Sequence, residues 1–219
     1  MASKNKVFLI DGSSYLYRAF HAMPPLTTSK GLPTGAIKGV VNMLRNLKKE
    51  HPESKIITVF DAKGKNFRHE ILNTYKANRP PMPKELVEQL EPLKSICNFM
   101  AAPVIEVKGV EADDVIAHLC KVLPQHPKDR AFIVSSDKDY LQLIDQQIIV
   151  YRPIQKEFYT EDTVKEKFGV APSNFLLYKT LMGDSSDKIA GIKGLGPKTL
   201  YKRFPELLEE NLSLNDILD

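Results

Sequence analysis

Short apolar runs alternate with longer amphipathic segments along the first two thirds of the chain. The runs 7–10, 56–60 and 131–134 are rich in β-branched and aromatic residues, as buried strands are. The segment 36–49 instead repeats apolar residues at intervals of three and four, which predicts a helix packed by one face. This alternation predicts an α/β fold with a mostly parallel central sheet covered by helices.

Acidic residues follow the predicted strands. Asp11, Asp61 and Asp137 each come shortly after an apolar run, and Glu111 follows a fourth run at 103–107. Ligands of parallel sheets lie at the carboxyl ends of the strands, so we expect these acids to gather at one edge. One Asp after a strand is a common turn residue, but four such positions favour a metal site.

Three acids are concentrated at the start of the helix predicted after residue 110, namely Glu111, Asp113 and Asp114. One or two negative side chains there stabilise a helix, by roughly 0.3–1 kcal/mol each. Three within four residues repel one another unless a cation lies among them. A divalent metal meets this need, whereas the alternative is an ordinary helix cap.

The totals limit the class of protein. With 219 residues and 42% hydrophobic content, the chain can form one large domain, or one domain with an appendage. Its N-terminus has only four successive apolar residues before a charge, which predicts neither a signal peptide nor a membrane span and favours a cytoplasmic protein. Cys97 and Cys120 lie in apolar helical patterns, so we expect reduced core side chains.

A basic stretch lies between the second strand and the acid-rich helix. Residues 62–84 contain six Lys or Arg residues but only one acid, Glu70, and two aromatic residues lie among them. Basic side chains neutralise phosphates and aromatic rings stack on bases, although a solvated lysine-rich helix is the alternative. We expect Lys76 to lie in a helix with Arg79 on nearly the same face.

The pattern changes after residue 159, and residues 160–219 predict helices and turns without a further strand. Asp184 and Asp187 are three positions apart, which would place them on one face of a helical turn. The Gly-rich segment 191–199 opens a helix with Pro197 near its first position, and such a turn suits a phosphate. Glycines that allow two helices to pack tightly explain the same segment equally well.

Four motifs together resemble the 5'-nuclease domain at the N-terminus of bacterial DNA polymerase I, a relative of flap endonucleases; they are 11–19, 60–65, 109–114 and 182–187. The resemblance covers essentially the whole chain. It implies a PIN-like α/β core at 1–159 with a helical arch at about 62–88. It also implies a helical DNA-binding region at 160–219, with a helix-three-turn-helix at about 184–204.

The resemblance also implies roles for individual residues. The ligands of catalytic divalent metals would be Asp11, Asp61, Glu111, Asp113, Asp114, Asp137, Asp139, Asp184 and Asp187. Lys76 and Arg79 would face the reacting phosphate. The DNA-binding residues would be Arg18, Lys63, Lys65, Arg68, Tyr75, Gly191, Lys193, Gly194, Gly196, Lys198 and Thr199. Relatives often carry Asp-Asn-Ile-Pro-Gly where this chain has 187–191 and Pro where it has Lys193, which implies an altered affinity for duplex DNA.

The implied activity is that of a metal-dependent 5'-nuclease in DNA replication and repair, which cleaves exonucleolytically or at flaps and leaves a 5'-phosphate. Carboxylate ligands suit Mg²⁺ in two or more sites about 4 Å apart, with Mn²⁺ as a substitute, and the hairpin allows a monovalent cation. With nine acids neutralised, the remaining 31 positive and 18 negative charges suit DNA as the partner, although a solvated basic surface is the alternative. The chain is expected to be a monomer that works with, or as a piece of, a DNA polymerase.

Two other functions remain open. A catalytically silent DNA-binding module would use the arch and hairpin alone, but the complete set of acids argues against it. A PIN-like ribonuclease would share acids at strand ends, but the Gly-rich hairpin argues for duplex DNA.

Overall fold

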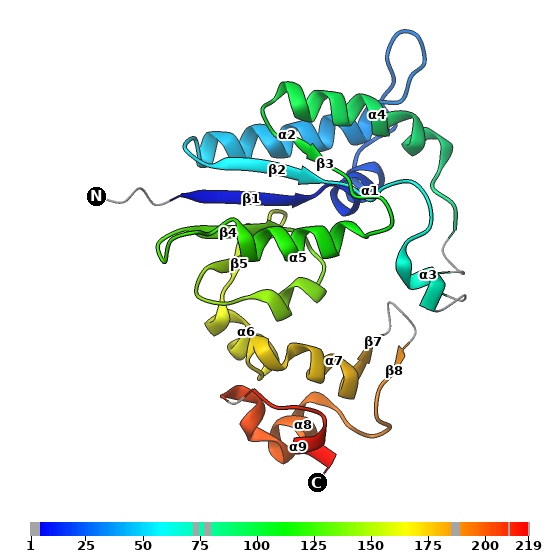
Figure 1. The fold of residues 1–219 in the computed structure, drawn as a ribbon. Helices are drawn as coiled ribbons and strands as arrows, with labels where there is room; N and C mark the ends of the chain where they lie inside the picture. The colour runs from blue at the N-terminus through cyan, green and yellow to red at the C-terminus, as the bar shows by residue number, and fades with distance from the viewer. Residues whose placement is uncertain (1–4, 72–74, 77–79, 185–188, 210, 219) are drawn as a thin grey trace. The chain divides into compact units, whose positions relative to one another are not determined.

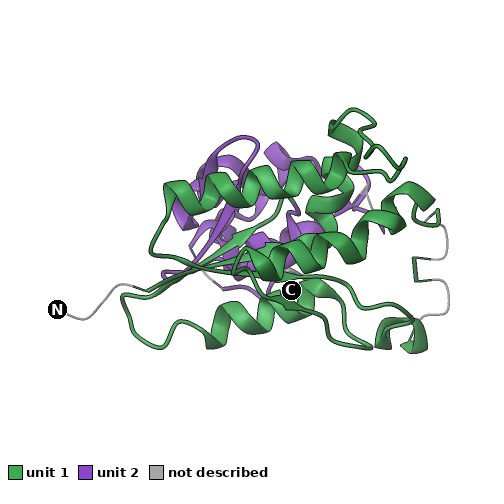
Figure 2. Cartoon of the chain, turned by 90° about the horizontal axis from the view of Figure 1, so that it is seen from above, with its two compact units in different colours: residues 1–136 green, residues 137–219 purple. Residues whose placement is uncertain are grey.

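The computed structural model describes residues 5–71, 75–76, 80–184, 189–209 and 211–218. The chain forms two compact units, residues 1–136 and 137–219 (Figure 2). The boundary predicted from the sequence, after residue 159, follows the last expected strand and lies inside the second unit.

The first unit is built on parallel strands, with β1 between β2 and β4 (Figure 1). The strand order is β3-β2-β1-β4, with the bounds β1 (Lys6–Asp11), β2 (Lys55–Val59), β3 (Val104–Ile105) and β4 (Arg130–Val134). The side chains of β1 and β4 are almost entirely buried, which is why these strands have continuous apolar sequences rather than alternating ones. The predicted parallel α/β fold is confirmed.

Four helices pack on this sheet: α1 (Gly12–Ala22), α2 (Gly35–Glu50), α4 (Lys84–Phe99) and α5 (Ala112–Val122). The chain steps outward from β1 to β2 to β3 through α1, α2 and α4, and it returns to β4 through α5. Right-handed crossovers therefore place α5 on the opposite face from the other three helices. Helices α2 and α4 lie side by side (Figure 1).

The segment between β2 and α4 differs from its prediction. A short helix, α3 (Phe67–Ile71), begins it, but Lys76 lies in a turn with a φ of 53°. A residue in the left-handed region cannot continue a right-handed helix, so the predicted helical position of Lys76 is wrong. Arg79 lies outside the described residues.

The second unit contains an antiparallel hairpin of β5 (Ile148–Arg152) and β6 (Glu157–Tyr159). The helical segment η1 (Asp139–Leu143) precedes this hairpin, and further helical segments follow it: α6 (Glu161–Phe168), η2 (Pro172–Asn174), α7 (Phe175–Met182), α8 (Pro197–Arg203), η3 (Pro205–Leu208) and α9 (Asn215–Leu218). Thr160 caps α6 through the backbone N–H of Thr163, and Pro197 is the first residue of α8, as its position in the sequence indicates.

A second antiparallel pair, β7 (Gly183–Asp184) and β8 (Ile189–Ala190), lies in the region where no strand was expected. The prediction is wrong because strands of two residues have no periodicity to detect. It also misplaces Asp184, which lies in β7 rather than in a helical turn, and Asp187 falls outside the described residues. Close backbone approach makes the pairing possible, since a Cβ at Gly183 would stand 2.3 Å from the backbone N of Gly191.

Cys97 and Cys120 are buried free thiols, in agreement with the sequence expectation. Among the described helices, none combines the length and the apolar character needed to cross a membrane.

Candidate active site

Asp11 is the centre of the acidic group in the first unit. It is the last residue of β1 and only 4% exposed. Its Oδ1 accepts the backbone N–H of Ser14 at 3.0 Å and caps α1, and its Oδ2 accepts the Ser135 hydroxyl at 2.9 Å. Burial, reinforced by the charges of Asp113 and Asp61, raises the pKa of Asp11 to about 7. Three acids distant in sequence therefore interact electrostatically.

Asp61 lies two residues beyond β2 and connects the starts of two helices. Its Oδ1 accepts the backbone N–H of Ala112, the first residue of α5, at 2.9 Å. Its own backbone N–H donates to the Ser13 hydroxyl in α1 at 2.9 Å. Because Asp11 pairs in register with Val59, Asp61 follows at the same edge of the sheet. The two strand ends and the start of α5 thus meet, as the sequence predicted for this unit.

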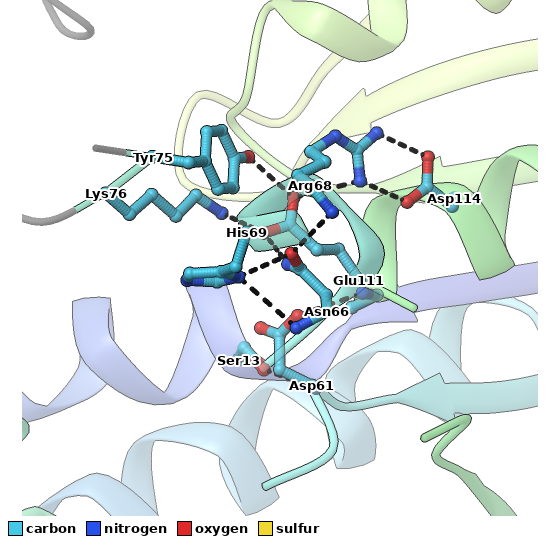
Figure 3. Close-up of polar contacts among 10 residues, drawn as sticks. Ser13, Asp61, Asn66, Arg68, His69, Tyr75, Lys76, Glu111 and Asp114 are labelled. Atoms are coloured by element: carbon cyan, nitrogen blue, oxygen red, sulfur yellow. Dashed lines mark hydrogen bonds and ion pairs between the residues drawn. The ribbon is translucent and has the colours of Figure 1, made fainter. Parts of the chain in front are cut away.

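Glu111 precedes α5 and is 8% exposed. Its Oε1 accepts from Asn66 Nδ2 at 2.6 Å and from Lys76 Nζ at 2.5 Å, and its Oε2 accepts from the Tyr75 hydroxyl at 2.9 Å (Figure 3). Burial acts to raise the pKa of Glu111, but the contacts with Lys76, Tyr75 and Arg68 outweigh burial and lower it. Glu111 is therefore held as a carboxylate.

Asp114 is held by Arg68 through two parallel contacts. Arg68 Nη1 lies 2.5 Å from Asp114 Oδ2, and Nη2 lies 2.8 Å from Oδ1 (Figure 3). These hydrogen bonds lower the pKa of Asp114. Arg68 and Lys76 thus supply the positive charge that three acids at a helix start require. Both come from the basic stretch, and the side chains of Arg68 and Tyr75, which the sequence assigns to DNA, contact Asp114 and Glu111.

The carboxylates of this group have the chemistry of a divalent metal site. In the part of the chain that the structure describes, no three acidic, His or Cys side chains converge closely enough to hold a metal ion as they stand. The carboxylates of Glu111 and Asp114 instead pair with the side chains of Lys76 and Arg68. A set of carboxylates is nevertheless what a hard divalent cation binds, and such a cation would favour the charged form of Asp11 that burial disfavours. The residues fit a divalent metal.

A titration prediction follows for Asp11. Between about pH 4 and pH 7 the folded protein keeps a proton on Asp11 that the unfolded chain releases, so stability falls as pH rises through this window. Asp11→Asn removes this titration. In a chelator, we expect the variant to be more stable than the wild type at about pH 8, on the order of 2–4 kcal/mol, with no gain at about pH 4. Urea unfolding at both pH values measures the difference, and a gain that does not depend on pH contradicts the prediction.

Acidic residues of the second unit also lie close to one another. Asp137 Oδ1 accepts the backbone N–H of Asp139 at 2.9 Å. Lys179, in α7, pairs with Asp139 and lies 2.6 Å from Asp184 Oδ2. Burial acts to lower the pKa of Lys179, but its hydrogen bonds to both acids outweigh burial and raise it. Lys179 was missed because one lysine in a helical sequence is typical of a solvated face.

The remaining basic and glycine positions lie on both units. Arg18 is half-buried in α1, and Lys63 and Lys65 are exposed beyond β2. In the second unit, Gly191, Lys193, Gly194, Gly196, Lys198 and Thr199 lead into and begin α8. Lys193 and Lys198 are exposed, and Gly194 has a φ of 81°.

Comparison with known families identifies the family of this chain. The family described as "5'-3' exonuclease, N-terminal resolvase-like domain" matches residues 6–169. The chain belongs to the 5'-3' exonuclease family. The chain is 50% identical over 198 residues to DNA polymerase I of Pseudomonas aeruginosa, and this match covers 90% of the chain and 22% of the polymerase. It is 44% identical over 194 residues to a 5'-3' exonuclease of Aquifex aeolicus, covering 88% of this chain and 66% of that protein.

Solved structures support membership of the 5'-3' exonuclease family. The T5 5'-exonuclease with bound divalent zinc ions matches 92% of this chain and 75% of its own, with a TM-score of 0.74 and 25% identity. The bacteriophage T5 flap endonuclease, in a pseudo-enzyme-product complex with DNA and metal ions, matches 98% of this chain and 78% of its own, with a TM-score of 0.74 and 25% identity.

Proposed function

We propose that this chain is a divalent-metal-dependent 5'-nuclease. It hydrolyses phosphodiester bonds near free 5' ends of DNA, exonucleolytically or at 5' flaps, and leaves a 5'-phosphate. The observation that carries the proposal is the interaction of Asp11 with Asp61 and Asp113 at the ends of β1 and β2 and the start of α5. Membership of the 5'-3' exonuclease family supports the reaction class.

The proposed metal-holding residues are the nine acids Asp11, Asp61, Glu111, Asp113, Asp114, Asp137, Asp139, Asp184 and Asp187. The T5 relatives with bound metal ions support divalent metal use, and the carboxylate donors favour Mg²⁺, with Mn²⁺ as a substitute. A bound divalent ion lowers the pKa of water and neutralises charge on a phosphate. A monovalent cation near the Gly-rich segment is part of the proposal.

The chain's own residues hold and balance these acids. Backbone N–H groups of Ser14 and Ala112 fix the carboxylates of Asp11 and Asp61, so these side chains need little reorganisation when substrate binds. Lys76 provides a positive charge beside Glu111, and we assign it, with Arg79, to the reacting phosphate.

DNA binding should depend steeply on salt, because Lys and Arg side chains release counterions when they neutralise phosphates. With Ca²⁺ in place of Mg²⁺ to block turnover, Lys193→Ala and Lys198→Ala should each reduce the slope of log affinity against log salt by about one. Lys121→Ala, which removes an exposed lysine at the end of α5, should leave the slope unchanged. Equal slopes in all four proteins would make the segment before α8 a structural turn.

Incubation of a 5'-flap duplex, a recessed duplex and their RNA counterparts with Mg²⁺ tests the function. We expect cleavage of the DNA substrates that a chelator abolishes, with products that carry a 5'-phosphate. Binding without cleavage indicates the silent DNA-binding module, and preferential cleavage of the RNA substrates indicates a ribonuclease. Either result overturns the proposal.

The setting of the activity is also proposed. The match to DNA polymerase I of Pseudomonas aeruginosa supports a role in DNA replication and repair alongside, or continuous with, a polymerase. We further propose that the nuclease works in the cytoplasm as a monomer on flap or branched duplex DNA.

A further inference from the structure

Two side chains at the start of α3 contact two acids at the start of α5. Asn66 Nδ2 lies 2.6 Å from Glu111 Oε1, and Arg68 holds both carboxylate oxygens of Asp114 at 2.5 and 2.8 Å (Figure 3). Arg68 Nη1 also lies 3.4 Å from Glu111 Oε2. Asn66 and Arg68, which are two positions apart in the sequence, thus orient both acids.

The Arg68–Asp114 pair determines geometry more than stability. The guanidinium plane of arginine presents parallel donors that match the two oxygens of a carboxylate, and a lysine ammonium cannot reproduce this arrangement. The side chains of Arg68 and Asp114 are 31% and 32% exposed. Pairs with this access to water contribute little to folding. The rigid fork therefore restricts the orientation of Asp114 at little gain in stability.

Asn66 has two separable roles. Its Oδ1 accepts the backbone N–H of Arg68 at 3.1 Å, which caps the first turn of α3, and also lies 2.7 Å from His69 Nδ1, whereas its Nδ2 donates to Glu111. The cap needs only an acceptor oxygen near the backbone, whereas the contact with Glu111 needs the amide nitrogen at the end of the side chain. The shorter Asn66→Ser therefore keeps the first role and loses the second.

We propose that Asn66 and Arg68 are positioning residues, which set the orientations in which Glu111 and Asp114 accept a divalent metal. This inference rests on the proposed function, and it replaces a phosphate contact as the role of Arg68. Ligand carboxylates are themselves held by hydrogen bonds, and loss of such a partner costs roughly 10–100-fold in metal affinity.

The test measures Mn²⁺ binding by electron paramagnetic resonance on the whole chain without DNA. Asn66→Ser and Arg68→Lys should each raise the dissociation constant for Mn²⁺ by roughly 10–100-fold. The melting temperature in chelator should change little, and the salt dependence of DNA binding in Ca²⁺ should stay that of the wild type. Asn42→Ser and Arg45→Lys, matched substitutions at exposed positions of α2, should bind Mn²⁺ like the wild type.

The contrary outcomes are distinct. Wild-type affinity for Mn²⁺ in both variants overturns the inference, and so does tighter binding, because the contacts would then compete with the metal. A lower melting temperature with unchanged Mn²⁺ affinity makes the two residues structural. A smaller salt slope for Arg68→Gln with unchanged Mn²⁺ affinity makes Arg68 a phosphate contact. Absence of saturable Mn²⁺ binding in the wild type contradicts the proposed function itself.

Discussion

Asp61→Asn should abolish cleavage and leave the folded protein as stable as the wild type, or more stable. The hydrogen bond from Ala112 survives, because the Asn amide oxygen accepts the backbone N–H as Asp61 Oδ1 does. The substitution also removes the negative charge of Asp61, which repels the carboxylate of the buried Asp11. Loss of a ligand charge from a metal-assisted hydrolysis should cost about 4 kcal/mol of transition-state stabilisation, or roughly a thousandfold in rate.

Single-turnover cleavage of a 5'-flap duplex and thermal unfolding in chelator measure the two quantities. Asp162→Asn, at an exposed acid in the first turn of α6, is the matched control and should cleave at the wild-type rate. A large drop in melting temperature for Asp61→Asn together with retained activity would show that Asp61 holds the fold and takes no part in the chemistry.

Lys76→Ala should lower the single-turnover rate at saturating enzyme by about a hundredfold, as for loss of one preorganised electrostatic donor. A cation aimed at charge that develops in the transition state lowers the barrier, whereas one that binds substrate and transition state equally changes affinity alone. We therefore expect the dissociation constant for DNA in Ca²⁺ to change only severalfold. Glu111 would keep Asn66, Tyr75 and Arg68 as partners, so the acid stays in place.

Lys84→Ala provides the control for this prediction. Lys84 begins α4, its side chain is 87% exposed, and its ammonium lies 3.9 Å from Glu88. The substitution removes one lysine from the same basic stretch, and Lys84 pairs with Glu88 rather than Glu111. The cleavage rate and the affinity for DNA should therefore stay near wild type. If Lys76→Ala instead binds DNA far more weakly and cleaves at the wild-type rate once saturated, Lys76 is a binding residue.

The sequence predicts the placement of the acids in the first unit because parallel strands bring their carboxyl ends to one edge. Asp11 and Asp61 follow strands whose apolar runs are continuous, so their elements and their direction were evident. The need for a cation beside Glu111, Asp113 and Asp114 was also evident from charge repulsion alone. Which cation meets that need was not, since Arg68 lies more than forty positions earlier in the chain.

The contacts that the sequence did not predict join separate elements. Lys179 meets Asp139 and Asp184 through packing of α7, and nothing local in its sequence distinguishes it from a solvated lysine. Asn is a residue favoured at helix N-caps, but the contact of Asn66 with Glu111 depends on where α5 begins. Lys76 combines a left-handed backbone conformation with a contact to the distant Glu111, and helix propensity predicts neither.

The close backbone approach at the β7–β8 pair limits which substitutions this protein tolerates. A side chain at Gly191 would place its Cβ 2.3 Å from the carbonyl carbon of Met182, and Gly183 has a φ of 77°. Neither glycine has a side chain that could bind a metal or a phosphate, yet any replacement pushes apart the strand that presents Asp184. Genetic drift should therefore be blocked at both positions as firmly as at an acid. Gly191→Ala offers a way to obtain a conditional allele in which every carboxylate and every lysine of the protein is retained.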